Sequence, residues 1–391
     1  MGIDVLLVNT AVVDFRGPQF ALTTELVGPG GLAKCPCADM PPYTQEQYRQ
    51  WIEAGLATAG GPGNAAPLLA RTGLKVAVGV NLGAGQYGGL DAQGRFFHDV
   101  MTANGIDMSA TVIHPELPTG TSFIHDKPGS ARGGIAYFPC ANNDFDFGHF
   151  RRAVKRLEPG LVYYMYSGLS DRGDANGGRD LADFIAWCRS QGIVTIADSH
   201  TLTGKLQELI AAGAPVNDYH LLEPLLPELD IFFTSSEEVL MIMNTLGNPH
   251  RWAEFSEEEN IRHSLDFLMR KYWTGEPRTR LLGVTFSGGA YIMEMGPGGI
   301  AHGPSRIESR FMSGEVIDLV GAGDSFRAGV IADIARDIQD FRKGITDFDH
   351  SVQMGNLFAS LFINAPLHDR YALIQSIDKM CKLASLGVSP A

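Results

Sequence analysis

Apolar segments of strand length alternate with amphipathic segments of helical length through most of this chain. Strand-like segments lie at 161–168 (LVYYMYSG), 193–199 (IVTIADS) and 230–235 (DIFFTS), and helical patterns at 179–192 and 205–213 separate them. A parallel strand needs a crossover to reach its neighbour, and a helix usually supplies that crossover. The alternation therefore predicts an α/β protein with a mostly parallel sheet covered by helices on both faces.

Further segments extend this pattern and add one exception. Residues 3–13 (IDVLLVNTAVV) and 75–83 (KVAVGVNLG) predict buried strands, because both are short and nearly continuously apolar. Asn64 is a candidate N-cap for the helical pattern that follows it. The segments 119–126 (TGTSFIHD) and 133–140 (GGIAYFPC) alternate in polarity across a glycine-rich turn, which predicts a β-hairpin.

The chain shows neither an internal repeat nor a dividing linker, so we expect a single domain over residues 1–391. Residues near 112–140 interrupt the alternation of strands and helices, because the predicted hairpin has no helix between its strands. The irregular segment 15–58 is its candidate partner, and parts of both would form a β lid. Ligands of parallel α/β sheets bind at the carboxyl ends of the strands, so motifs that directly follow strands are the best candidates for binding residues.

The charge and apolarity of the chain exclude several classes of partner. Hydrophobic residues make up 45% of the 391 residues, which is enough for a large core. A net charge of −13 argues against general binding to nucleic acid or anionic membranes, because those polyanions recruit Lys and Arg. No apolar run reaches the length of a membrane span, so we expect no membrane partner.

The five cysteines and the amino-terminal residues bear on the compartment. The cysteines are few, odd in number and mostly far apart, which favours a reducing cytosol over a disulfide framework. Cys35 and Cys37 lie close together and could bind a metal, but we expect two free thiols there. No Lys or Arg precedes Arg16, whereas a signal peptide needs a basic start, so the start reads as a strand and we expect a cytoplasmic protein.

The most informative motif is DLVGAGDSFR (318–327), which follows an extended stretch and opens a helical pattern. A helix N-terminus offers free N–H groups and partial positive charge, which suits an anion. The glycines keep side chains away from that backbone, so phosphate oxygens can approach it. Asp324 would stand beside the anion and could accept a proton from a hydroxyl group that attacks a phosphoryl group.

Two remote motifs carry a resemblance to a known family. DLVGAGDSFRAG (318–329) resembles the carboxyl-terminal signature of the ribokinase-like (PfkB-type) carbohydrate kinases, and AGGPGNAAPLLARTG (59–73) is similar to their glycine-rich upstream motif. Shorter motifs follow in the family's order: VVDF with Asp14, LPELDIFFTSSEEV (226–239), VTFSGG (284–289) and GNLFAS (355–360). The resemblance implies a three-layer α/β/α fold with a small β lid.

The resemblance also implies roles for individual residues. Asp324 would be the general base, and the backbone N–H groups of Gly321, Ala322 and Gly323 would bind the transferred phosphoryl group. Asp14, Gly60 and Asn64 would bind substrate hydroxyls. Glu238 would orient Mg²⁺ through water, and Asp318 with nearby carbonyls would bind K⁺. Thr285, Ser287 and Asn356 would line the ATP site.

Six positions depart from the family pattern, two of them, Ala59 and Thr72, in the upstream motif. Ser235 replaces the usual Asn of the acidic motif, so the magnesium contacts are expected to differ. Ser287 replaces Gly and adds bulk near the nucleotide, and Leu319 replaces Thr in the signature. Val12 stands where ribokinases proper carry Asn, which argues against ribose as the favoured substrate.

Three alternatives stay open. GAGQYG (83–88) has the glycine spacing of a dinucleotide site, with Asp107 further along, which would suit an NAD(P)-binding oxidoreductase. Asp198 and His200 end a strand and could hold a metal in a hydrolase. The third is a non-catalytic sugar- or nucleotide-binding regulator on the same fold, although binding alone would not need Asp324.

The sequence thus favours an ATP- and Mg²⁺-dependent kinase that phosphorylates a hydroxyl group of a small sugar or nucleoside. Lid strands have unpaired edges, and this, with the family's habit, predicts a homodimer formed through the lid.

Overall fold

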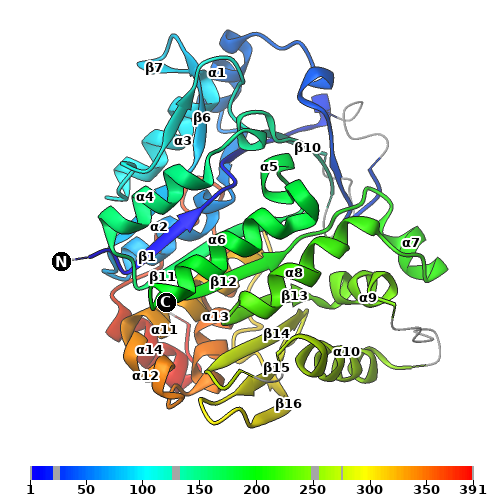
Figure 1. Ribbon diagram of the computed structural model, residues 1–391. Helices are drawn as coiled ribbons and strands as arrows, with labels where there is room; N and C mark the ends of the chain where they lie inside the picture. The colour runs from blue at the N-terminus through cyan, green and yellow to red at the C-terminus, as the bar shows by residue number, and fades with distance from the viewer. Residues whose placement is uncertain (1, 21–26, 126–132, 248–254, 274–275, 390–391) are drawn as a thin grey trace.

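The computed structural model describes residues 2–20, 27–125, 133–247, 255–273 and 276–389 (Figure 1). Within these residues, eight strands form the main sheet in the order β16-β15-β14-β13-β12-β11-β1-β5. The pairs from β5 across to β14 are parallel, whereas β15 and β16 form an antiparallel edge. The strands are β1 (Val5–Val8), β5 (Val76–Gly79), β11 (Leu161–Ser167), β12 (Val194–Ser199), β13 (Ile231–Ser235), β14 (Arg280–Phe286), β15 (Gly289–Met295) and β16 (Ala301–Glu308).

Helices cover both faces of this sheet, because successive strand residues point to opposite sides. Leu7 and Phe233 pack into one hydrophobic core, whereas Leu6 and Phe232 pack into the other. The first core contains α2 (Pro62–Arg71), α3 (Ala92–Ala103), α11 (Ala322–Arg336), α13 (Phe348–Ile363) and α14 (Ile377–Leu386). The second contains α4 (Phe147–Leu157), α6 (Arg179–Ser190), α8 (Leu222–Leu225), α9 (Ser236–Thr245) and α10 (Glu257–Tyr272). The expected three-layer architecture is confirmed (Figure 1).

A second sheet stands beyond the carboxyl end of β1. Its strand order is β3-β10-β9-β2-β4, with the expected antiparallel hairpin formed by β9 and β10. The strands are β2 (Val12–Arg16), β3 (Leu32–Lys34), β4 (Ala57–Gly60), β9 (Thr121–His125) and β10 (Gly134–Phe138). It therefore draws on both segments from which a lid is expected, 15–58 and 112–140, although residues 21–26 and 126–132 of those segments lie outside the described part.

A third, small sheet contains β6 (Asn81–Gly85), β7 (Gly89–Leu90) and β8 (Val112–His114). The GAGQYG motif (83–88) runs from β6 into the turn before β7 and does not open a helix. The next helix, α3, begins after Asp91, which is its N-cap. The strand–turn–helix context of a dinucleotide site is therefore missing, and the alternative based on this motif loses its support.

The described residues form four more α-helices: α1 (Gln45–Glu53), α5 (Asp171–Asp174), α7 (Leu206–Ala212) and α12 (Ile338–Lys343).

Two long apolar segments divide between sheets, contrary to the prediction of single strands. Residues 3–13 form β1 and β2, and the chain changes direction at Asn9, whose φ is 53°. Residues 75–83 likewise divide into β5 and β6. Both halves of each segment are buried, so apolarity alone could not show where the pairing partner changes.

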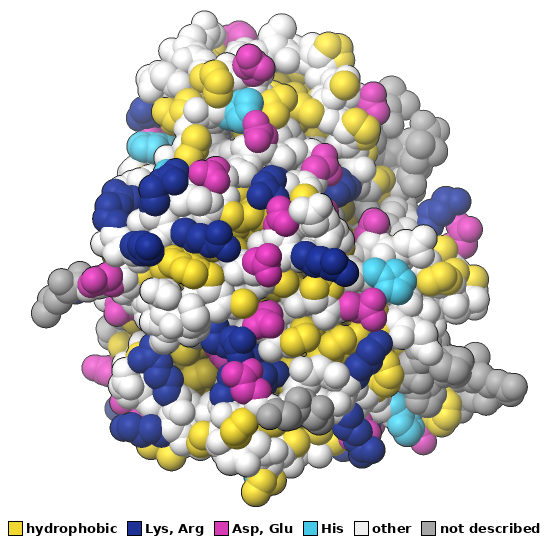
Figure 2. All heavy atoms as spheres, viewed as in Figure 1, with side chains coloured by type: hydrophobic (Ala, Val, Ile, Leu, Met, Phe, Trp, Pro, Cys, Tyr) yellow, Lys and Arg dark blue, Asp and Glu magenta, His cyan; other side chains and the backbone are white. Residues whose placement is uncertain are grey.

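The surface drawn in Figure 2 mixes charges of both signs. Lys and Arg side chains gather over α4, and Asp and Glu side chains lie among them. This face therefore presents no field of a single sign to a charged partner. No helix in the described part of the chain is both long and apolar enough to cross a membrane.

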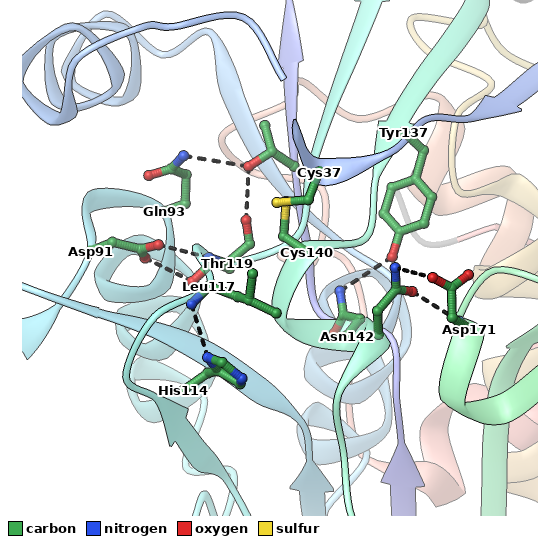
Figure 3. The surroundings of a disulfide bond; sticks show 12 residues. Cys37, Asp91, Gln93, His114, Leu117, Thr119, Tyr137, Cys140, Asn142 and Asp171 are labelled. Carbon is green, nitrogen blue, oxygen red and sulfur yellow. Dashed lines mark hydrogen bonds between the residues drawn. A yellow bond between two sulfur atoms is a disulfide. The ribbon is translucent and has the colours of Figure 1, made fainter. Parts of the chain in front are cut away.

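A disulfide bond corrects the expectation of two free thiols at Cys35 and Cys37. Cys37 pairs with Cys140, and their Cα atoms lie 5.0 Å apart (Figure 3). The parallel pairing of β3 with β10 brings these remote segments together, and the N–H of Cys35 donates to the carbonyl of Tyr137 at 2.7 Å. Cys35 itself remains a free thiol. The partner lies 103 residues away, a separation that local sequence patterns do not reveal.

This crosslink should contribute strongly to stability. Loss of a native disulfide that closes a loop of 103 residues is expected to cost about 2–5 kcal/mol, chiefly because the unfolded chain regains freedom. Cys37→Ser should lower the free energy of urea-induced unfolding by that amount when no reductant is present. Cys35→Ser is the matched control and should change little. Equal stability of Cys37→Ser and the parent protein would contradict the expected contribution.

Candidate active site

The turn before α11 is held open by glycine. Gly321 has φ 92°, and a Cβ atom there would lie 2.8 Å from Phe362 and 3.0 Å from Asn64. The residue must therefore lack a side chain for Asn64 to approach the helix N-terminus. The segment before the turn, residues 309–320, forms no strand, which differs from the extended stretch that the sequence suggests. Residues 312–317 are exposed to solvent.

Asp324 lies in the first turn of α11, and its side chain is buried yet borders a cavity of about 200 Å³. Its Oδ2 accepts hydrogen bonds from Asn64 Nδ2 at 2.8 Å and from the Tyr166 hydroxyl at 2.6 Å. Arg327 Nη1 lies 3.6 Å from Oδ1. Burial raises the pKa of Asp324, while Arg327 and the two hydrogen bonds oppose that rise. The arrangement holds a carboxylate of increased basicity at the cavity wall.

Arg327 connects Asp324 to a second buried carboxylate. Its Nη1 lies 3.2 Å from Asp198 Oδ2, which also accepts a hydrogen bond from the Tyr163 hydroxyl at 2.9 Å. The backbone N–H of Tyr166 donates to Asp198 Oδ1 at 2.8 Å. Burial raises the pKa of Asp198 to about 6. Both oxygens of Asp198 thus position Arg327 and Tyr166, which argues against its expected alternative role as a hydrolase metal ligand.

Asp14 and Asn64 reach the same cavity from different elements. Asp14 lies in β2, and the Ser122 hydroxyl donates to its Oδ1. Burial raises the pKa of Asp14, and Arg16 and Ser122 oppose the rise. Gly60 acts by leaving space, because a Cβ atom there would lie 2.5 Å from Asp14 Oδ2. Asn64 lies within the first turn of α2, whose N-cap is Gly61, so its expected role as N-cap is wrong.

The cavity lies between the two larger sheets. Leu32 of β3 and Ile135 and Tyr137 of β10 line one side. Residues at the carboxyl ends of β11, β12, β13 and β14 line the other: Tyr166, Ser199, Ser235 and Thr285. A parallel sheet presents its ligand sites at this edge, and the cavity lies there as expected from the sequence.

Glu238 also borders this cavity, but its carboxylate is already well supplied with donors. Oε2 accepts from Ser199 Oγ at 2.9 Å, Thr234 Oγ1 at 3.2 Å and the backbone N–H of Ser235 at 3.1 Å. The Ser235 side chain caps α9 in return, which gives a local reason for serine in the acidic motif. A carboxylate held in this way fits a magnesium ion reached through water better than one bound directly.

Asp318 has guanidinium partners where a cation ligand is expected. Its Oδ2 lies 3.0 Å from Arg16 Nη2 and 2.8 Å from Arg370 Nη2, and its Oδ1 accepts from the N–H of Val320 at 2.9 Å. Two positive groups would repel a potassium ion at this carboxylate. The geometry thus favours Asp318 as an anchor of the segment before α11 and gives no support to its side chain as a K⁺ ligand.

A second cavity, of about 210 Å³, adjoins the first at the start of α11. Both are bordered by Ala322 and Gly323. The residues expected to line the ATP site, Thr285, Ser287 and Asn356, all border this second cavity. Much of its remaining lining is apolar, which suits a flat aromatic base.

Two residues of the first cavity, Tyr166 and Arg327, were not predicted from the sequence. Arg327 is the last residue of the motif DLVGAGDSFR, so its position was visible although its role was not.

The sequence matches a known protein family over most of its length. Residues 51–252 and 288–367 match the family model of the pfkB family carbohydrate kinases, which is more than half of the chain. The chain belongs to this family. No curated protein matches its sequence.

Solved structures agree with this pfkB family assignment. The chain is similar to a probable sugar kinase from Rhizobium etli CFN 42, with a TM-score of 0.62, 18% identity and coverage of 99% of this chain and 100% of the other. It is also similar to Anopheles gambiae adenosine kinase in complex with P1,P4-di(adenosine-5) tetraphosphate. The TM-score is 0.63 and the identity 16%, with coverage of 94% of this chain and 97% of the other. For a putative ribokinase II from E. coli with ATP and Mg²⁺, the TM-score is 0.61 and the identity 14%, with coverage of 98% of this chain and 99% of the other. The TM-scores show a shared fold, and the family match shows that the chain belongs to a family of kinases.

Proposed function

We propose that this pfkB kinase transfers the γ-phosphoryl group of ATP to a hydroxyl group of a small sugar or nucleoside, with Asp324 as the general base. One observation carries the proposal: the Asp324 carboxylate borders a partly polar cavity and directly follows Ala322 and Gly323, the backbone that this cavity shares with a second, largely apolar cavity. The first cavity suits an acceptor with several hydroxyl groups, and the second suits a nucleotide base.

The residues of the chain divide the chemical work between them. Asp14 and Asn64 hold the acceptor, and Asp324 takes the proton of its attacking hydroxyl group. The α11 N-terminus faces the transferred group, with Gly321 and Gly323 as donors. The N–H of Ala322 already donates to the carbonyl of Leu319 at 3.1 Å, so it is the least available of the three expected donors. When bound, Mg²⁺ neutralises charge on the triphosphate, and Glu238 would orient its water ligands.

The five-stranded sheet would act as a lid over the acceptor. Leu32, Ile135 and Tyr137 present side chains from that sheet to the cavity opposite Asp324. Closure would exclude water, which otherwise competes with the acceptor for the phosphoryl group.

The outer strands β3 and β4 leave edges that could pair with a second copy, so we propose a homodimer through this sheet. Light scattering tests it, and a mass equal to one chain would contradict it.

The pH dependence of kcat/KM should be sensitive to the hydrogen bond from Tyr166 to Asp324. A general base works only when ionised, so kcat/KM should fall as the pH falls through the raised pKa of Asp324. Tyr166→Phe removes a donor that stabilises the carboxylate. The acid limb of the kcat/KM profile should then move to higher pH, whereas Tyr163→Phe, which loses a contact with Asp198 instead, should move it less. An unchanged acid limb in Tyr166→Phe would contradict this role.

A panel of sugars and nucleosides, with release of ADP as the readout, tests the proposed function. We expect saturable ADP release that needs Mg²⁺–ATP and at least one acceptor. If no acceptor raises the rate above background while ATP still raises the melting temperature, the chain binds nucleotide without catalysis and the proposal fails.

A further inference from the structure

Three side chains of different metal-binding types meet away from the active site. Asp333 lies in the last turn of α11, His350 in the first turn of α13 and Cys381 in α14. One ligand atom from each lies within 4.8 Å of the other two. Asp333 is nine positions beyond Asp324, or about 13 Å along the helix axis, so this cluster is separate from the proposed catalytic machinery.

The distances within the cluster match those between ligands of one ion. In tetrahedral Zn²⁺ sites, bonds of about 2.1 Å to nitrogen or oxygen and 2.3 Å to sulfur place neighbouring ligand atoms roughly 3.4–3.6 Å apart. Here Asp333 Oδ1 lies 3.2 Å from His350 Nδ1 and 3.8 Å from Cys381 Sγ. Small side-chain movements would bring all three atoms onto a common ion.

The outer atoms of two ligands already have partners. The Ser351 hydroxyl donates to Asp333 Oδ2 at 2.7 Å, which leaves Oδ1 facing the cluster. His350 Nε2 lies 3.3 Å from the carbonyl of Cys381, so a proton on Nε2 leaves the Nδ1 lone pair toward the cluster. Metal-ligating histidines and carboxylates typically have such outer partners, which fix their orientation. A simple ion pair between Asp333 and His350 would not need the thiol to converge on the same point.

One cationic side chain competes for this position. Arg336 Nη1 lies 3.2 Å from Cys381 Sγ, and its Nη2 lies 3.5 Å from Asp333 Oδ1. The Arg336 side chain is 45% exposed, so it can turn into solvent when an ion arrives. The cluster borders a cavity of about 430 Å³ that offers a route for the ion. Asp337, Asp340 and Asp347 on its walls favour a cation and outnumber Lys382, the other cationic side chain there besides Arg336.

We propose that Asp333, His350 and Cys381 bind a Zn²⁺ ion, with water as the fourth ligand. A thiolate, an imidazole and a carboxylate together suit Zn²⁺ better than Mg²⁺ or Ca²⁺, which prefer oxygen. The ion would crosslink α11, α13 and α14 at the end remote from Asp324.

The test uses tag-free, full-length protein without thiol reductant, which keeps the Cys37–Cys140 disulfide intact. Titration with Co²⁺ should produce a thiolate-to-cobalt charge-transfer band and tetrahedral ligand-field bands, and one equivalent of Zn²⁺ should abolish them. Cys381→Ser should remove the charge-transfer band, whereas Cys35→Ser, which alters a half-buried free thiol outside the cluster, should retain it.

Two further variants act on affinity without removing a ligand. Ser351→Ala should weaken Zn²⁺ binding about 10–100-fold, because it frees Asp333 Oδ2. Arg336→Met should strengthen binding, because it removes the competing charge. The proposal is overturned if no charge-transfer band forms, if Cys381→Ser retains it, or if Arg336→Met weakens the binding of Zn²⁺. Should Cys381→Ser fail to fold, the opposite changes expected of Ser351→Ala and Arg336→Met decide the question.

Discussion

Asp324→Asn should lower kcat by about 10²–10⁴-fold, the usual contribution of a positioned general base. The substitution keeps the size of the side chain and an oxygen that can still accept from Asn64 and Tyr166. It removes the ability to take a proton. Binding of ATP should stay near normal, because the residues of the second cavity are unchanged. Initial rates, with nucleotide affinity measured by calorimetry, separate the two effects.

The matched control is Asp349→Asn, the same substitution at an exposed position of α13. It should leave kcat within about twofold of the parent, because surface substitutions away from a site usually have small effects. Near-parent turnover in Asp324→Asn would show that the proton leaves by another route. An equal loss in both variants would point to a general effect of lost negative charge.

Arg327→Met should destabilise the protein by about 3–5 kcal/mol, because it leaves buried carboxylates without their cationic partner. Arg327 Nη1 lies 3.2 Å from Asp198 and 3.6 Å from Asp324, and all three side chains are buried. Denaturant unfolding measures the change. Arg152→Met is the control, since Arg152 is exposed and its ion pair with Asp146 lies at the surface, so little change is expected there.

A double-mutant cycle separates lost packing from lost charge pairing. If the stranded carboxylate dominates, Asp198→Asn combined with Arg327→Met should cost less than the sum of the single changes, with a coupling energy of about 1–3 kcal/mol. Strict additivity would mean that Arg327 acts by packing alone and would contradict the electrostatic role assigned to it.

Much of the fold follows from local pattern. The parallel sheet is predictable because β11, β12 and β13 are buried on both faces and alternate with helices, so their sequences are short apolar runs. The strand β16 escaped prediction because almost all of its residues are exposed, which leaves no apolar periodicity to detect. The placement of Asp324 at the start of α11 was predictable because glycines followed by a carboxylate and an apolar helical pattern are typical of a helix N-terminus.

The missed features depend on contacts between remote residues. Tyr166 reaches Asp324 across 158 positions, and no spacing rule predicts such a pair. Asp318 was expected to bind a cation, but Arg16 and Arg370, far from it in sequence, occupy its carboxylate. Cys37 finds Cys140 only because β3 pairs with β10. In each case the residue type was visible in the sequence, but its partner became known only from the fold.

The most direct test is to detect the phosphorylated product by phosphorus NMR. Phosphorus NMR of a reaction with Mg²⁺–ATP and an acceptor identified from the panel should show a phosphomonoester that forms in step with ADP. In Asp324→Asn, both signals should grow at least about 100-fold more slowly. Release of inorganic phosphate without an ester, or an ester formed equally fast by Asp324→Asn, would contradict the central claim.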